Sequence, residues 1–170
     1  MRKPEKIREE ARVILKKYKI SSPPVPVEFI AESLGATVRY SSFEGELAGM
    51  LVRRDGQAVI GVNSFHHTNR QRFTIAHEIG HLRLHKGDVH IDRSFRVNNR
   101  NAVSSQAIDP EEIEANRFAA ELLMPFDLIM RELRDNSIDV EDENQIKLLA
   151  DKYEVSVQAM TLRLTKLLNI

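Results

Sequence analysis

The sequence predicts an α+β protein with a small antiparallel sheet packed on a helix and a mostly helical C-terminal part. Three observations predict this class. Two short apolar stretches, 47–53 and 57–63, flank an Asp55-Gly56 pair that is typical of a β-hairpin turn. Apolar residues then recur at helical spacing from Arg70 to His85. The last third of the chain carries only helical patterns.

Length and composition restrict the possible classes of protein. A chain of 170 residues with 42% hydrophobic and 29% charged residues can form one domain with a sizeable core, and this composition excludes disorder. The 25 basic and 25 acidic residues cancel, so no overall basic field favours nucleic acid or a membrane surface. No apolar run approaches the length of about 18 residues that a membrane span needs, so we expect a cytoplasmic protein.

The helical spacing of apolar residues and the positions of proline and glycine predict the N-terminal elements. Apolar residues at helical spacing predict a helix over 5–18, which Ser21-Ser22-Pro23-Pro24 ends. A shorter helix over 26–34 ends at Gly35, and a strand over 37–40 follows.

The C-terminal elements begin after a polar segment, 87–108, which we expect to be a long surface excursion. Asp109-Pro110 begins a strong helix that Pro125 ends. The remaining predicted helices lie near 126–135, 143–153 and 156–168.

Charge is distributed unevenly along the chain. Residues 1–20 carry eight basic and three acidic side chains, whereas residues 109–154 carry five basic and fourteen acidic ones. Two interpretations stay open, because such segments form either docking faces or solvated helix surfaces.

The predicted helix over 70–85 contains His-Glu-x-x-His at 77–81. Histidines four residues apart lie on one helix face, so the rings of His77 and His81 can converge on one metal ion. Glu78 lies about 100° around the helix, beside the ion. The sheet would then pack on a metal-binding active-site helix. The alternative is that both histidines only pack in a helix interface. Because the chain has no cysteine, any metal must take nitrogen or oxygen ligands.

A catalytic zinc site needs a third protein ligand, and the helix from 110 offers Glu111, Glu112 and Glu114. Glu112 and Asn116 share a face with the apolar stripe of this helix, whereas Glu111 flanks it and Glu114 lies outside it. The stripe consists of Ala115, Phe118, Ala119, Leu122 and Leu123. A carboxylate in an inward stripe should be paired or bound to a metal, which favours Glu112.

A capping box is the alternative for Glu112. Asp109 at the N-cap with a glutamate at the third helical position would use the Glu112 side chain locally. The metal interpretation gains from Asn116, which could hold a ligating histidine through its other ring nitrogen.

Two segments resemble the signature segments of the ImmA/IrrE family of metallopeptidases. They are Arg-Phe-Thr-Ile-Ala-His-Glu-Ile-Gly-His at 72–81 and Glu-Ile-Glu-Ala-Asn-Arg-Phe-Ala-Ala-Glu-Leu-Leu-Met-Pro at 112–125, and the resemblance spans roughly residues 25–130. It implies a gluzincin-like endopeptidase that typically cleaves a helix-turn-helix transcriptional repressor. It further implies Zn²⁺, with Mn²⁺ as another possible metal. The implied ligands are His77, His81 and Glu112, with Glu78 as catalytic carboxylate and Asn116 orienting a histidine.

Several other residues qualify for roles near such a site. We interpret His85 as a core or cleft-wall residue, because a rigid helix places it about 12 Å from His77. Tyr40 and the pair His66-His67 are candidates for stabilising an oxyanion, although a surface role is the commoner one for each of them. The strand over 57–63 could present an edge to an extended peptide substrate, or could be a plain interior strand.

The C-terminal third offers a competing function. Leu149-Ala150, a Val155-Ser156 turn with Ser156 as N-cap, and Met160 and Leu164 form the apolar skeleton of a helix-turn-helix. A DNA-binding or protein-binding regulator with a structural metal site is therefore the second hypothesis. Mixed charges over residues 143–166 make a poor phosphate-binding face, so we expect no direct nucleic-acid binding. We expect a metallopeptidase domain over 1–130 and a helical segment over 131–170 packed on it.

Overall fold

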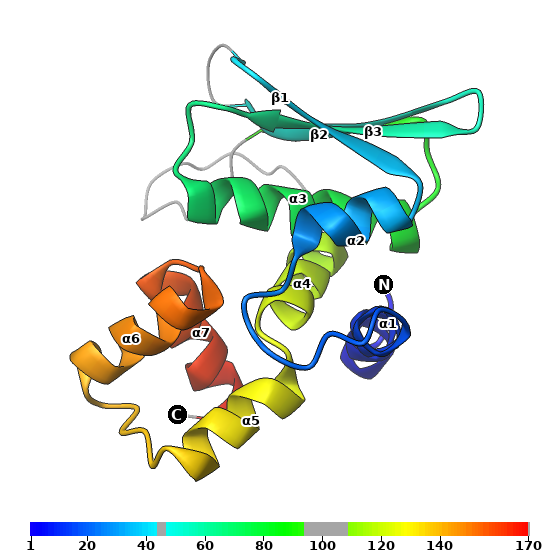
Figure 1. Cartoon of the computed structure of the whole chain (residues 1–170). Helices are drawn as coiled ribbons and strands as arrows, with labels where there is room; N and C mark the ends of the chain where they lie inside the picture. The colour runs from blue at the N-terminus through cyan, green and yellow to red at the C-terminus, as the bar shows by residue number, and fades with distance from the viewer. Residues whose placement is uncertain (44–46, 94–108, 170) are drawn as a thin grey trace, which may run out of the picture.

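The fold is α+β, as the sequence predicts, with a small sheet and seven helices in the part of the chain that the structure describes (Figure 1). The structure is a computed structural model and describes residues 1–43, 47–93 and 109–169. In chain order the elements are α1 (Pro4–Lys17), α2 (Val27–Ser33), β1 (Ala36–Ser41), β2 (Leu47–Arg54), β3 (Gln57–Asn63), α3 (Thr68–Leu84), β4 (Val89–Arg93), α4 (Pro110–Leu123), α5 (Phe126–Asp135), α6 (Glu143–Tyr153) and α7 (Val157–Leu168).

The sheet is mixed rather than wholly antiparallel. Its strand order is β1-β3-β2-β4, with β1 parallel to β3 and the other two pairs antiparallel. The predicted β2–β3 hairpin forms, but β1 joins the far side of β3 instead of pairing with its neighbour in the chain. β3 is therefore an interior strand, which is the second of the two alternatives that the sequence leaves open for residues 57–63, and it presents no edge to a peptide.

The fourth strand lies inside the segment for which the sequence predicted a surface excursion. β4 pairs with β2 through a register that sets His90 opposite Leu51 and Ile91 opposite Met50. Pairing with β2 gives this polar segment a strand conformation that its composition does not predict. The remainder of the predicted excursion, 94–108, lies outside the described residues.

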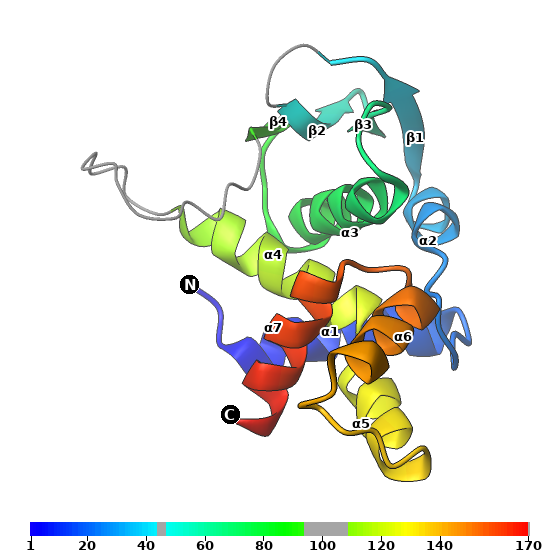
Figure 2. The ribbon, with the colours of Figure 1, turned by 90° about the vertical axis from the view of Figure 1, so that its left-hand side faces the viewer.

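The sheet forms the upper layer of the molecule and α3 runs beneath it, as Figures 1 and 2 both show. Leu51, Ile60 and Val62 from the sheet and Ile75 and Ile79 from α3 are all fully buried. Strand alternation and the i, i+4 spacing on α3 place these side chains face to face. Burial of each such side chain stabilises the fold by about 1.5–3 kcal/mol.

Gly49 allows β2 to lie directly on α3. A Cβ at this position would stand 2.3 Å from Cγ2 of Thr74 and 2.8 Å from the carbonyl oxygen of Gly61. Both separations are far inside van der Waals contact, so only glycine fits without a shift of strand or helix. The same Cβ would stand 3.7 Å from Oε1 of Glu78, so this close approach covers the Glu78 side chain.

The oppositely charged segments of the chain pair with each other in part. Arg2 binds Glu114 and Arg8 binds Glu121, joining the start of the chain and α1 to α4. Glu121 also accepts from Arg163 of α7 at 3.0 Å. Glu114 lies outside the apolar stripe of its helix, but this side of α4 also faces the interior. Both glutamate side chains are buried, because α1 and α7 cover this side of α4.

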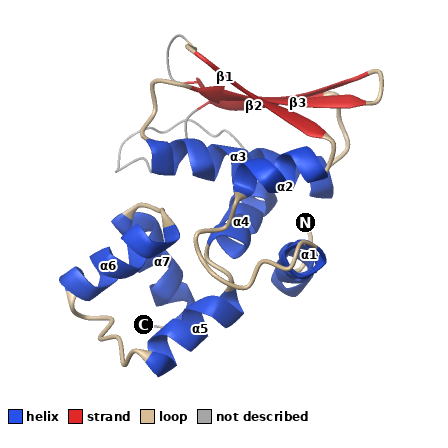
Figure 3. Ribbon diagram, in the orientation of Figure 1, coloured by secondary structure: helices blue, strands red, loops and turns tan. Residues whose placement is uncertain are grey.

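The C-terminal helices form at the predicted positions (Figure 3), and none of the described helices combines the length and apolarity needed to cross a membrane. Leu149, Ala150, Met160 and Leu164 are buried as expected, and Ser156 caps α7. The turn between α6 and α7 contacts the first half of α3. There Asn69 donates to the Val155 carbonyl at 3.0 Å, and Arg72 lies 3.1 Å from Glu154.

We predict that Gly49→Ala lowers the free energy of unfolding by about 1–3 kcal/mol, because the new methyl group overpacks the β2–α3 contact. Urea denaturation measures this. Adding Thr74→Ser removes Cγ2, the atom nearest to the new methyl group, and should restore part of the loss. Equal stability of Gly49→Ala and the unmodified protein would contradict the close contact.

Candidate metal centre

His77 and His81 lie one turn apart on α3 and point to the same place. Their Nε2 atoms are 3.0 Å apart, and both side chains are almost fully buried. The helix period brings the rings together, as the spacing of the motif predicts. α3 supplies two nitrogen donors that converge on one point beneath the sheet.

Glu112 comes from the first turn of α4 and completes a group of three. Its carboxylate oxygens lie 3.3 Å from Nε2 of His77 and 3.2 Å from Nε2 of His81. The N-cap Asp109 accepts from the backbone N–H of Glu111. Burial alone would raise the pKa of the Glu112 carboxyl, but the contacts with His77 and His81 hold it well below its usual range. Glu112 is thus ionised and faces the two imidazoles.

The approach of α4 to α3 depends on Gly80. A Cβ at Gly80 would lie 3.0 Å from Cα of Ala115 and 3.2 Å from the Phe118 ring. The two helices therefore cross at backbone contact, one turn from each of the facing residues His77 and Glu112. A larger residue at Gly80 would move Glu112 away from the histidines.

The donor set fits a divalent metal. Two ligands at about 2.0–2.1 Å from a tetrahedral zinc ion stand about 3.3 Å apart. The three separations among His77, His81 and Glu112 are 3.0, 3.2 and 3.3 Å. Two imidazole nitrogens and one carboxylate leave a fourth position for water, which is the donor set of a catalytic site.

Asn116 lies one turn beyond Glu112 on α4, and its Oδ1 is 3.1 Å from Nδ1 of His77. An amide oxygen only accepts, so Nδ1 of His77 carries the proton and Nε2 presents its lone pair toward His81 and Glu112. The structure thus places Asn116 where the sequence analysis expects it, behind a candidate ligand.

Glu78 is fully buried on α3, next to His77 in sequence but turned toward β2. It does not belong to the group of His77, His81 and Glu112 whose donor atoms lie within 4.8 Å of one another. A buried carboxylate beside that group, rather than in it, suits a base that handles protons near a metal.

His85 makes contacts that the sequence analysis missed. It is buried, as a core residue should be, and its Nδ1 lies 3.0 Å from Nδ1 of His81. Its Nε2 lies 3.2 Å from Oε2 of Glu114. The i, i+4 spacing from His81 predicts the first contact, but only the packing of α4 on α3 brings Glu114 to the second.

His90 of β4 is a second residue that sequence reasoning missed, because its segment lacks a strand pattern. Its ring stacks on that of His81, with centroids 4.3 Å apart. His81, His90 and Glu111 form a second group whose donor atoms lie within 4.8 Å of one another. The two candidate sets share His81.

The oxyanion candidates from the sequence lie elsewhere. His67 caps α3 by accepting from the Asn69 backbone N–H, about 15 Å along the helix from His77. Tyr40 is on β1, at the opposite edge of the sheet from β4, and its hydroxyl donates to Glu28. His66 precedes α3 and is one residue farther from the centre than His67.

Comparison with known proteins agrees with this geometry. The family model described as the IrrE N-terminal-like domain, Peptidase_M78, matches residues 31–165. The chain belongs to the Peptidase_M78 family. The match begins at residue 31 and extends past the C-terminal limit of the resemblance over 25–130, so it includes α6 and most of α7. Membership of Peptidase_M78 supports a metallopeptidase of the ImmA/IrrE type, and such a protein requires a metal.

Two individual proteins resemble this Peptidase_M78 chain. A protein of Bacillus phage phi105 named "Uncharacterized immunity region protein 2" is 27% identical over 136 residues, which cover 80% of this chain and 78% of the phage protein. A solved structure of a Mycobacterium tuberculosis transcriptional regulator superposes with a TM-score of 0.61 at 13% identity, covering 95% of this chain. The chain spans 46% of that regulator, and the likeness shows the fold alone.

We predict one divalent metal ion per chain, lost in His77→Ala and Glu112→Ala, because removal of either donor leaves an incomplete set. Elemental analysis of protein purified without chelator measures the stoichiometry. His90→Ala and Glu111→Ala are the controls and should keep the ion. Loss in these two variants and retention in the first two would show that the second group holds the metal.

Proposed function

We propose that the chain is a zinc-dependent endopeptidase that cleaves a helix-turn-helix transcriptional repressor and so relieves repression. The observation that carries this proposal is the group of His77, His81 and Glu112 at tetrahedral ligand separations, with Glu78 buried beside it. Zn²⁺ suits two imidazoles and a carboxylate, and Mn²⁺ accepts the same donors.

The residues divide the chemistry among them. His77, His81 and Glu112 would hold the ion, and Asn116 keeps His77 in the tautomer that coordinates through Nε2. A bound divalent metal supplies a water of lowered pKa and polarises the scissile carbonyl. Glu78 takes the proton from the attacking water and delivers it to the leaving amine, a task suited to a carboxylate that is not a ligand.

β4 provides the edge along which a peptide substrate would bind. Among the described residues it is the edge strand of the sheet beside β2, and its inward residue His90 stacks on His81. Val89 and Ile91 are half-exposed on the opposite face, so the strand lies at the surface and reaches the centre. An extended substrate added to this edge would pass the metal.

A repressor is the substrate that the family resemblance and the comparisons support best. The name of the phage relative refers to an immunity region. This name suits a peptidase that acts on a regulator, and a repressor segment in extended form suits an edge strand.

The alternative function, a DNA-binding regulator with a structural metal site, has less support. The α6–α7 turn is held against α3 by Asn69 and Arg72, and Arg163 of α7 is buried against Glu121. Through these contacts α6 and α7 pack against α3 and α4 and stabilise them. A cytoplasmic location remains a prediction, as does the division of the chain near residue 130.

We predict that Glu78→Gln keeps the metal and the fold but loses proteolysis by a factor of about 10²–10⁴, because the amide cannot take a proton. Metal content, circular dichroism and cleavage of a repressor encoded beside the gene, followed by mass spectrometry, measure the three properties. Full cleavage by this variant would refute the mechanism, whereas loss of metal would make Glu78 a ligand.

We also predict that substrate pairing with β4 uses alternate backbone N–H groups of the peptide, because an edge strand bonds every second residue. Once the cleavage site is known, substrate peptides with single N-methyl groups should lose cleavage at one alternating set of positions near it. Uniform effects at all positions would indicate another binding mode.

A further inference from the structure

A line of contacting polar side chains runs from His81 away from the candidate metal centre. Nδ1 of His81 lies 3.0 Å from Nδ1 of His85, and Nε2 of His85 lies 3.2 Å from Oε2 of Glu114. Nη1 of Arg2 donates to the same Glu114 oxygen at 2.6 Å. The backbone N–H of Arg2 donates to Oε1, so both carboxylate oxygens are satisfied.

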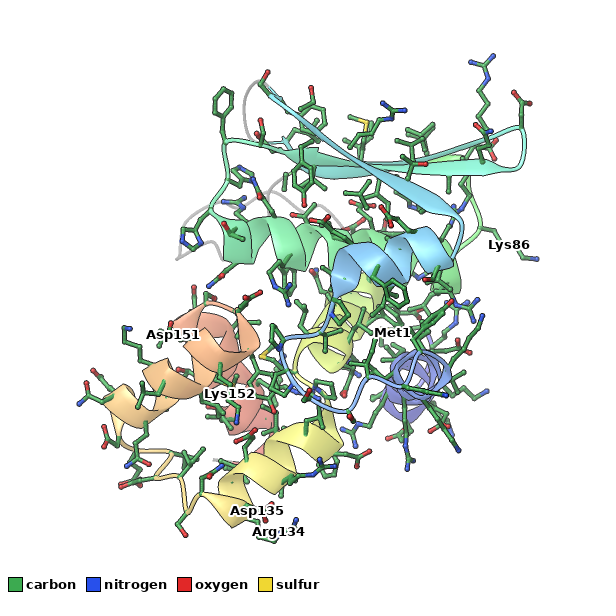
Figure 4. The ribbon with its side chains drawn as sticks, viewed as in Figure 1. Met1, Lys86, Arg134, Asp135, Asp151 and Lys152 are labelled. Carbon is green, nitrogen blue, oxygen red and sulfur yellow. The ribbon has the colours of Figure 1, made fainter. Side chains whose placement is uncertain are left out.

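This line is built into the interior, where polar groups need partners. His81, His85 and Glu114 are buried, whereas Arg2 is half-exposed at the surface end. Arg2 also donates to the carbonyl oxygen of Leu84 in the last turn of α3. It therefore joins the end of α3 to α4. Lys86, two residues beyond α3, points into solvent and takes no part in the line (Figure 4).

Only one direction of proton donation satisfies every atom in this line. Ionised Glu114 only accepts, so Nε2 of His85 must carry the proton that faces it. Nδ1 of a neutral His85 is then an acceptor, and Nδ1 of His81 must donate to it. A His81 ring with its proton on Nδ1 presents the lone pair of Nε2 toward His77 and Glu112, as coordination requires.

We propose that His85, Glu114 and Arg2 are positioning residues that hold the His81 ring in its metal-binding tautomer and orientation. This inference rests on the proposed metal site. His77 has Asn116 for the same task, so each candidate histidine ligand has an acceptor of its own on Nδ1. The start of the chain thereby contributes to metal affinity, although Arg2 is two contacts removed from His81.

The molecule contains a matched control for this line. Glu121 is on the same helix as Glu114 and equally buried, with side-chain exposures of 5% and 4%. Its surface partner Arg8 is 44% exposed, and Arg2 is 43% exposed. The Arg8–Glu121 pair meets Arg163 of α7 rather than a histidine. A variant in this pair therefore measures how the loss of a buried ion pair affects the protein when that pair has no contact with a candidate metal ligand.

The test is zinc affinity, measured by competition with a chelating indicator, together with the visible absorption spectrum of the Co²⁺ form. Glu114→Leu and His85→Leu should weaken binding about 10–100-fold and change the Co²⁺ spectrum, because His81 loses its orientation. His85→Gln should restore most of the affinity, since its amide offers one acceptor and one donor. Glu121→Leu should leave affinity unchanged.

Arg2→Ala and Arg8→Ala extend the test to surface residues, whose removal spares the core. Arg2→Ala should weaken zinc binding several-fold, and Arg8→Ala should not. Unchanged affinity in Arg2→Ala and in folded Glu114→Leu would overturn the proposal, and so would equal losses in the Glu114 and Glu121 variants. Failure of the unmodified protein to bind zinc would instead overturn the proposed function.

Discussion

The candidate centre depends on how closely α4 crosses α3. At Gly80 the two helix backbones meet with no side chain between them, and Glu112 reaches the two histidines only because of this contact. His77, Asn116, His85 and Glu114 also meet across this interface. The close crossing of α3 and α4 is possible because Gly80 has no Cβ. This crossing sets the separations among the donor atoms of His77, His81 and Glu112, which come from two helices far apart in sequence.

This arrangement buries charged carboxylates of α4, and arginine side chains from other elements pair with them. An ionised carboxylate inside a protein needs a partner, and Glu114 and Glu121 each have at least one arginine. Burial alone would raise the pKa of Glu114, but hydrogen bonds from Arg2 lower it to about 2, so this carboxylate remains charged. Ion pairs between the basic residues near the N-terminus and the acidic residues after 109 thus join the start of the chain to α4.

The sheet and the C-terminal helices support α3 from two sides. β2 lies on α3 at Gly49 and covers Glu78, and β4 places His90 against His81 at the open edge. On the other side, the α6–α7 turn contacts the first half of α3 through Asn69 and Arg72. A rigid helix held on both sides is what a site needs when its donor atoms must stay within tenths of an ångström.

Local spacing by itself determined the helices, the β2–β3 hairpin, the convergence of His77 and His81, and the phase that turns Glu112 and Asn116 toward them. Each of these depends on residues a few positions apart, where helix and strand periods act. Tertiary structure alone decided the interior place of β3, the strand at β4, the burial of Glu114 and its contact with His85. These features depend on which distant element packs against a given face of a helix or strand. The hydrophobic periodicity of a segment does not specify its tertiary neighbour.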